Sequence, residues 1–164
     1  MHLVYAKVRE PELEYAVECH CRVCHASNNF RPGGRPSYEE FRRQFRERGV
    51  WEESRMHLLR SLQDARTLLD VADTRAGERV GFYWVVFSDW YEHHWAEIND
   101  IYVEERFRRR GAATEMLSHI EAEVRRLGAE VLNSGTGVDN VASQRMHERY
   151  GFTPRRYEYQ IWLD

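Results

Sequence analysis

A short segment between positions 103 and 114 combines consecutive arginines with small residues at the predicted start of a helix. The N-terminus of a helix presents unpaired backbone N–H groups and the positive end of the helix dipole, so it attracts phosphate. Small side chains let a pyrophosphate approach the backbone, and arginines add charge-assisted hydrogen bonds. The pattern therefore predicts a phosphate-binding loop, although it matches neither the Walker motif nor the three-glycine dinucleotide motif. Its residues are Arg108, Arg109, Arg110, Gly111, Ala112, Ala113 and Thr114.

Three cysteines and two histidines lie together near the N-terminus, at Cys19, His20, Cys21, Cys24 and His25. One interpretation is a metal site, because thiolates and imidazoles are zinc ligands. The other is packing, since apolar residues recur at helical spacing from position 13 to position 24 and cysteine is common in protein cores. No second cysteine pair completes a tetrahedral set, so we favour packing, reduced thiols and no bound metal.

The length and composition predict one domain over residues 1–164. The chain has 42% hydrophobic and 31% charged residues, which is typical of a folded globular protein. Its formal net charge of -3 gives no overall reason to expect nucleic acid or an anionic membrane as a partner. We find no apolar run of membrane-spanning length and no signal-peptide layout, so we expect a cytoplasmic protein.

The order of predicted elements is β-α-α-β-β-β-α-β-α-β, which indicates an α/β fold with a single mixed sheet and helices on both faces. The expected helices begin near Pro11, Ser37, Gly111 and Asn140, and Gly49 interrupts the second. The expected strands are the stretches rich in β-branched and aromatic residues. They cover residues 3–8, 67–73, 79–89, 94–104, 129–134 and 157–163.

Two segments resemble motifs of the GNAT acetyltransferase family. Arg108-x-x-Gly111-x-Ala113 is similar to the Arg/Gln-x-x-Gly-x-Gly/Ala signature of the family's pyrophosphate loop. The stretch from Asn140 to the closing Gly-Phe at Phe152 is similar to its second motif. The two occur in the expected order, separated by a predicted helix and strand. The resemblance implies the GNAT fold and acetyl-CoA as the cosubstrate.

The resemblance also implies how the cosubstrate is held. In this fold two adjacent parallel strands splay apart, and the pantetheine arm lies in the gap, bonded to the main chain of one strand. In this sequence those groups are expected at Ile101, Tyr102 and Val103, with Asn140 and Ser143 contributing from the second motif. The thioester is then expected to point toward the middle of the strand.

Acetyl transfer to an amine benefits from one group that takes a proton from the amine and another that protonates the departing thiolate. Glu97 and Asp100 resemble strand carboxylates that serve as the base in different branches of the family. Strict alternation places these two on opposite faces of the sheet, which a bulge would disturb. The family's usual acid is a tyrosine, but His147 occupies that position, which leaves His147, Tyr150 or water as the acid.

The sequence says less about the amine that accepts the acetyl group and about the oligomeric state. The aromatic residues and histidines within 84–95, together with the loop 28–38, are expected to form a pocket for a protonated amine. We therefore predict an N-acetyltransferase that acts on a small-molecule amine or a peptide N-terminus or lysine, by direct attack in a ternary complex. The alternative is a degenerate module that binds acyl-CoA without turnover. The aromatic stretch 157–163 also leaves open a homodimer formed by pairing of strand edges.

Overall fold

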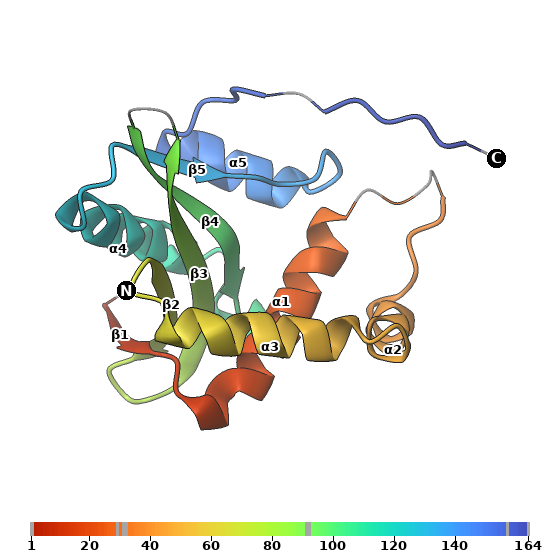
Figure 1. The fold of residues 1–164 in the computed structure, drawn as a ribbon, viewed down its shortest axis with the longest axis horizontal. Helices are drawn as coiled ribbons and strands as arrows, with labels where there is room; N and C mark the ends of the chain where they lie inside the picture. The colour runs from red at the N-terminus through yellow and green to blue at the C-terminus, as the bar shows by residue number, and fades with distance from the viewer. Residues whose placement is uncertain (1, 29, 31–32, 91–92, 157, 164) are drawn as a thin grey trace.

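The computed structural model describes residues 2–28, 30, 33–90, 93–156 and 158–163. Within these residues, one five-stranded sheet has the order β1-β2-β3-β4-β5 (Figure 1). Strands β1 to β4 pair antiparallel with their neighbours, whereas β4 and β5 are parallel, which confirms the predicted mixed sheet. The strands are β1 (Leu3–Lys7), β2 (Thr67–Thr74), β3 (Arg79–Trp90), β4 (His93–Val103) and β5 (Val131–Ser134).

The helices begin and end where the sequence provides caps and breaks. The side chain of Ser37 accepts a hydrogen bond from the N–H of Glu40 (3.2 Å) and caps α2. Gly49 has a left-handed conformation (φ 76°) and separates α2 from α3. The helical elements are η1 (Glu10–Glu12), α1 (Leu13–Ser27), α2 (Tyr38–Glu47), α3 (Val50–Gln63), η2 (Glu105–Phe107), α4 (Ala112–Arg126) and α5 (Val141–Tyr150).

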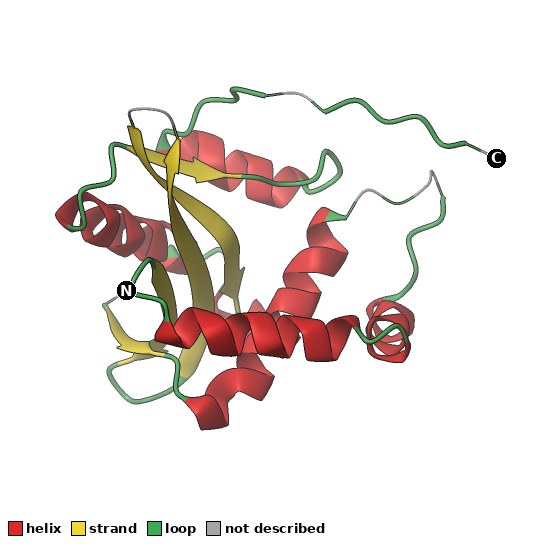
Figure 2. Cartoon of the chain, in the orientation of Figure 1, coloured by secondary structure: helices red, strands yellow, loops and turns green. Residues whose placement is uncertain are grey.

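The sheet separates two apolar cores, and Figure 2 shows helices on both of its sides. On one face α1, α2 and α3 pack on the central strands, with Leu13, Leu58 and Phe82 fully buried between them. On the other face α4 and α5 pack on the sheet through residues that include Met116 and Ile120. Over the described residues, no helix combines the length and the apolar character needed to cross a membrane.

The cysteine-rich part of α1 belongs to the first of these cores. Cys19 and Cys21 are buried, Cys24 is half-buried and packs against the same core, and all three are free thiols. Burial raises the pKa of the Cys21 thiol to about 11, which keeps it protonated at neutral pH. The packing interpretation of Cys21 and Cys24 is therefore confirmed. Among the described side chains, no three histidines, cysteines or carboxylates are placed to hold a metal ion.

A β-bulge interrupts β4 near its middle. Trp84 of β3 pairs with Asp100, but the next residue of β3, Val85, pairs with Ile98. Asn99 is therefore an extra residue that has no counterpart on β3. A bulge of this kind shifts the alternation of side chains between the two faces of a strand.

The predicted last strand is not formed by residues 158–163, and Tyr157 lies outside the described residues. Tyr159, Ile161 and Leu163 are 80% or more exposed, and Figure 1 shows this segment extending beyond α5. A strand needs a neighbouring strand to accept and donate its backbone hydrogen bonds, whereas alternating side chains supply only a suitable face. The prediction of a strand here is therefore wrong for the described residues, and pairing into a homodimer stays a prediction.

Candidate functional site

Strands β4 and β5 form a fork. They pair only as far as Ile98 and Ser134, whereas β4 continues to Val103 with its other edge paired to β3. One edge of residues 101–103 therefore faces the fork, where backbone groups are open to a ligand. These are the three positions at which the family resemblance implies contacts with pantetheine.

The loop after β4 leads through η2 into the N-terminus of α4. Arg109 and Gly111 have positive φ angles (59° and 84°), so the backbone turns sharply into the helix, and the angle at position 111 favours glycine. The first helical bond runs from the N–H of Glu115 to the carbonyl of Gly111 (3.0 Å). The N–H groups of residues 112–114 consequently have no acceptor within the helix, which is the arrangement that binds phosphate.

The three arginines of this loop are exposed, and Arg108 has a second role in addition to the predicted one. Its Nε donates to the carbonyl oxygen of Val103 (2.9 Å), and its guanidinium lies 5.5 Å from the centre of the Tyr102 ring. Arg108 therefore ties the loop to the end of β4. This contact links the predicted phosphate loop to the fork, which the sequence pattern did not indicate.

The second motif builds the start of α5. The Oδ1 atom of Asn140 accepts a hydrogen bond from the N–H of Ser143 (3.2 Å), which caps the helix. The side chain of Gln144 donates to the carbonyls of Gly137 and Val138 (3.1 and 2.8 Å). These bonds hold the loop between β5 and α5, so Asn140 and Ser143 have a structural role that needs no ligand.

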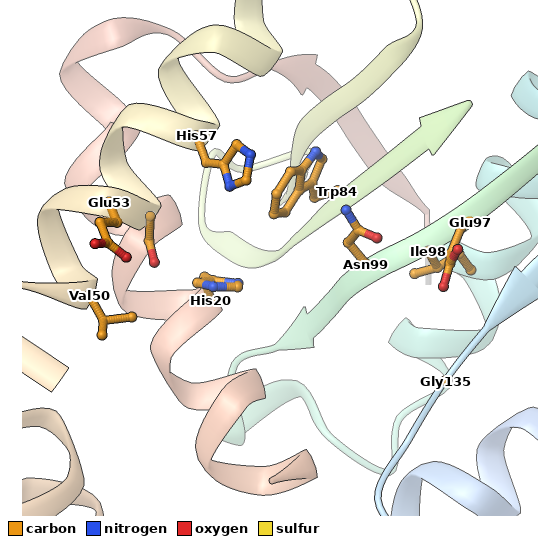
Figure 3. A pocket seen from close by; sticks show the side chains of 10 residues that line it. His20, Val50, Glu53, His57, Trp84, Glu97, Ile98, Asn99 and Gly135 are labelled. Carbon is orange, nitrogen blue, oxygen red and sulfur yellow. The ribbon is translucent and has the colours of Figure 1, made fainter. Parts of the chain in front are cut away.

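A cavity of about 490 Å³ opens between α1, α3 and β4. Figure 3 shows His20 and Glu53 on the helix side of it, Glu97 on the strand side, and Trp84 between them. Because Gly135 directly follows β5, the cavity also reaches the fork. The lining residues are His20, Val50, Glu53, Ser54, His57, Trp84, Glu97, Ile98, Asn99 and Gly135.

The bulge at Asn99 decides which carboxylates face this side of the sheet. Glu97 pairs with Val86 and Asp100 pairs with Trp84, and both partners belong to the core under α1 and α3. The extra residue therefore brings Glu97 and Asp100 to the same face. Strict alternation, which placed them on opposite faces, is wrong here because the bulge shifts it by one position.

The two carboxylates have different surroundings. Glu97 is exposed at the cavity wall, whereas Asp100 is only 2% exposed and its Oδ2 lies 2.8 Å from Nδ1 of His20. Burial on its own lowers the pKa of His20, but the hydrogen bonds with Asp100 and Cys24 and the charge of Asp100 outweigh it and raise the pKa to about 10. At neutral pH His20 is therefore an imidazolium, and of Glu97 and Asp100 only Glu97 is open to a substrate.

The two predicted acids, His147 and Tyr150, do not line the cavity. His147 is 8% exposed, with Nδ1 at 2.8 Å from the carbonyl oxygen of Ser143 and Nε2 at 2.7 Å from Oγ of Ser134. The hydroxyl of Tyr150 donates to Glu121 on α4 (2.6 Å), and burial together with this hydrogen bond raises the pKa of Tyr150. The structure therefore separates both groups from Glu97.

The predicted aromatic pocket is only partly formed. Trp84 lines the cavity, but Phe87 packs against the core under α4, and Tyr91 lies outside the described residues. No described residue of the loop 28–38 lines the cavity.

Helix residues take the place of these expected aromatics. The sequence patterns did not indicate a site at Glu53 or His57, and they suggested His20 only as a possible metal ligand. Glu53 and His57 come from α3, and His20 comes from α1. The sequence did contain one signal that His20 has a polar partner. An ionisable side chain among the apolar residues of a helix is buried when the helix packs, and it then needs a polar partner on the element beneath it.

Comparison with known proteins supports this arrangement. A model of the acetyltransferase (GNAT) family matches residues 35–152, a range that includes both motifs, the fork and most of the cavity. Among curated proteins no significant sequence match is found.

Solved structures show the same fold at low sequence identity. An aminoglycoside 6'-N-acetyltransferase from Acinetobacter baumannii is 15% identical with a TM-score of 0.68, covering 99% of this chain and 100% of that one. A predicted acetyltransferase from Clostridium acetobutylicum, solved with acetyl-CoA, is 15% identical with a TM-score of 0.71, covering 99% and 97%. The enzyme AAC(6')-Iy, in complex with the bisubstrate analogue CoA-S-monomethyl-acetylneamine, is 19% identical with a TM-score of 0.63, covering 99% and 100%.

Proposed function

This chain belongs to the acetyltransferase (GNAT) family, whose cosubstrate is acetyl-CoA, and we propose that it acetylates a primary amine by direct attack in a ternary complex. One observation carries the proposal. The fork between β4 and β5 lies between the N-terminus of α4, which is suited to bind phosphate, and a cavity that Glu97 lines. We also take residues 1–164 as one domain, because both cores share the same sheet.

The proposed cosubstrate site combines the loop and the fork. The backbone N–H groups of residues 111–114 bind the pyrophosphate, and the side chains of Arg108, Arg109 and Arg110 neutralise its charge. Residues 101–103 bind the pantetheine through their backbone, and Asn140 and Ser143 border it from α5. The cosubstrate supplies the acetyl group as a thioester, which transfers more readily than an amide.

Glu97 is the proposed base. An attacking amine must lose a proton to form the amide, and Glu97 is the exposed carboxylate on the strand wall of the cavity. Asp100 acts differently, because it is buried and holds the charge of His20.

The acceptor that fits best is a small cationic amine. Glu53 and Glu97 place carboxylates on opposite walls of the cavity, and Trp84 offers an aromatic surface for an ammonium group. A volume of about 490 Å³ suits a small molecule, or only the end of a peptide or a lysine side chain.

The proposal is tested by titrating the protein with acetyl-CoA in a calorimeter and then measuring thiol release with a panel of amines. The panel should include aminoglycosides, polyamines and short peptides with free N-termini. Binding followed by amine-dependent thiol release is the expected result. Binding without release on any amine would favour the acyl-CoA-binding module, and no binding would overturn the proposal.

A further inference from the structure

His147 stands where the family motif has a tyrosine, and its ring is held in one orientation. A carbonyl oxygen only accepts hydrogen bonds, so Nδ1, at 2.8 Å from the carbonyl of Ser143, carries a hydrogen. The ring also packs edge-on against Phe152, with 5.1 Å between ring centres. These contacts turn Nε2 toward the hydroxyl of Ser134 at 2.7 Å.

Ser134 occupies the base of the fork. It is the last residue of β5 and pairs with Ile98, beyond which β4 and β5 separate. Leu132, two residues earlier on the same face of β5, packs in the core under α4, so the Ser134 side chain lies on the α4–α5 face. Glu97 lies on the opposite face. The fork is therefore bordered by a carboxylate on one side and a hydroxyl on the other.

We propose that Ser134, aligned by His147, donates the proton that the departing thiolate of coenzyme A receives. This assignment rests on the proposed function, because it concerns the same reaction. As the carbon–sulfur bond of the thioester breaks, its electron pair moves to sulfur, and the Ser134 O–H gives its proton to that sulfur. Protonated His147 replaces the proton through Nε2, and its ring is left neutral until it takes a proton from water. The proton of the amine goes to Glu97.

The observed hydrogen bonds are compatible with both the neutral and the protonated form of His147. With a neutral ring, the Ser134 hydroxyl donates to Nε2 of His147; with a protonated ring, Nε2 donates and the hydroxyl hydrogen turns away toward the fork. The bond from Nδ1 to the carbonyl of Ser143 is the same in both states. Tyr150 is not available for this role, because its hydroxyl donates to Glu121.

Equilibrium binding provides a test that does not depend on turnover. Coenzyme A and desulfo-coenzyme A, which lacks the thiol, are titrated into the wild type and into Ser134→Ala and Ser134→Thr. The wild type should bind coenzyme A about fivefold more tightly, since a hydrogen bond between uncharged groups is worth about 1 kcal/mol. Ser134→Ala should bind both compounds equally, and Ser134→Thr should restore the preference.

Kinetics then separate proton donation from structural support. In Ser134→Ala, kcat should fall about 100-fold while KM for the amine is unchanged, and Ser134→Thr should recover most of the rate. His147→Gln should keep the preference for coenzyme A but lose the rate, because an amide aligns the hydroxyl without supplying a proton. Ser118→Ala, which changes an exposed hydroxyl that donates to Thr114, is the matched control.

Two results would contradict the assignment. An unchanged preference for coenzyme A in Ser134→Ala, with melting behaviour like the wild type, would overturn it while leaving the proposed function intact. Failure of the wild type to bind either compound would overturn the proposed function and this assignment together.

Discussion

His20 and His147 lie on opposite faces of the sheet, and their partners differ in kind. His20 faces the buried carboxylate of Asp100 at 2.8 Å and its pKa is raised to about 10, so it carries a fixed charge. His147 faces a carbonyl and the hydroxyl of Ser134, neither of which carries a charge. The same residue type is thus a structural cation on the face with the cavity and, in the proposed proton transfer, a proton carrier on the other face. The role of each histidine therefore depends on the group that it contacts rather than on the residue type.

The largest expected effect on the rate is at Glu97, on the face of the sheet with the cavity. Glu97→Gln should lower kcat by about 1,000-fold at neutral pH, because an amide cannot take a proton from the amine. Binding of acetyl-CoA, measured by calorimetry, should stay within about twofold of the wild type. Glu148→Gln, an exposed change on α5, is the control. Equal rates across the pH range would reduce Glu97 to a structural role.

Asp100→Asn removes the negative charge from the buried ion pair between His20 and Asp100. Removing one partner of a buried ion pair typically costs about 3 kcal/mol, and urea unfolding should show a loss of this size at pH 6. The folded pKa of His20, about 10, lies above its ordinary value of 6.5. The contribution of the pair is therefore fully present below about pH 6.5 and is lost as the pH rises toward 10.

The control for this prediction is a second histidine–aspartate pair, whose side chains are exposed to solvent. His94 and Asp89 lie 2.7 Å apart with 69% and 53% of their side chains exposed. Asp89→Asn should change the free energy of unfolding far less than Asp100→Asn, because an ion pair between exposed side chains is screened by water. If Asp100→Asn cost no more than Asp89→Asn at pH 6, His20 would not be a structural cation.

A smaller effect is expected at the phosphate loop, which is proposed to bind coenzyme A and is separate from the sites of both histidines. Arg108→Ala should weaken coenzyme A binding about tenfold, because it removes a charge near the pyrophosphate and the bond to Val103. Calorimetry measures the change, and Arg126→Ala at the far end of α4 is the control. Unchanged affinity in Arg108→Ala would remove this residue from the cofactor site.

The smallest effect is expected at Tyr150. Tyr150→Phe removes a hydrogen bond to Glu121 at the surface of α4, so thermal unfolding should show a loss of about 1 kcal/mol or less. The kcat should stay within about twofold, because the hydroxyl already donates to Glu121. A large loss of rate would identify Tyr150 as the acid in place of Ser134 and His147.

Sequence patterns predicted the elements whose signals are local. The apolar periodicity of α4, the cap at Ser37 and the break at Gly49 depend on residues within a few positions of one another, and all are present in the structure. The segment 157–163 also had a local strand pattern, yet residues 158–163 form no strand. Its failure shows the limit of such patterns, because a strand needs a partner that the pattern does not supply.

The candidate site was predicted in part for the same reason. Chain order alone puts the phosphate loop directly after β4, so the loop could be read from spacing. The bond between His20 and Asp100 joins residues 80 positions apart, and it requires both the packing of α1 on the sheet and the bulge at Asn99. The bond between Ser134 and His147 requires α5 to fold back on β5.

The mixed α/β class, the family and the residues available for chemistry could thus be predicted from the sequence. The pairing of Asp100 with His20, the exposure of Glu97 to the cavity and the place of Ser134 beside the fork became known from the folded chain. Helical and strand periodicities could be predicted because they depend on local geometry. A side chain's charge state and exposure instead depend on what the rest of the chain packs against it.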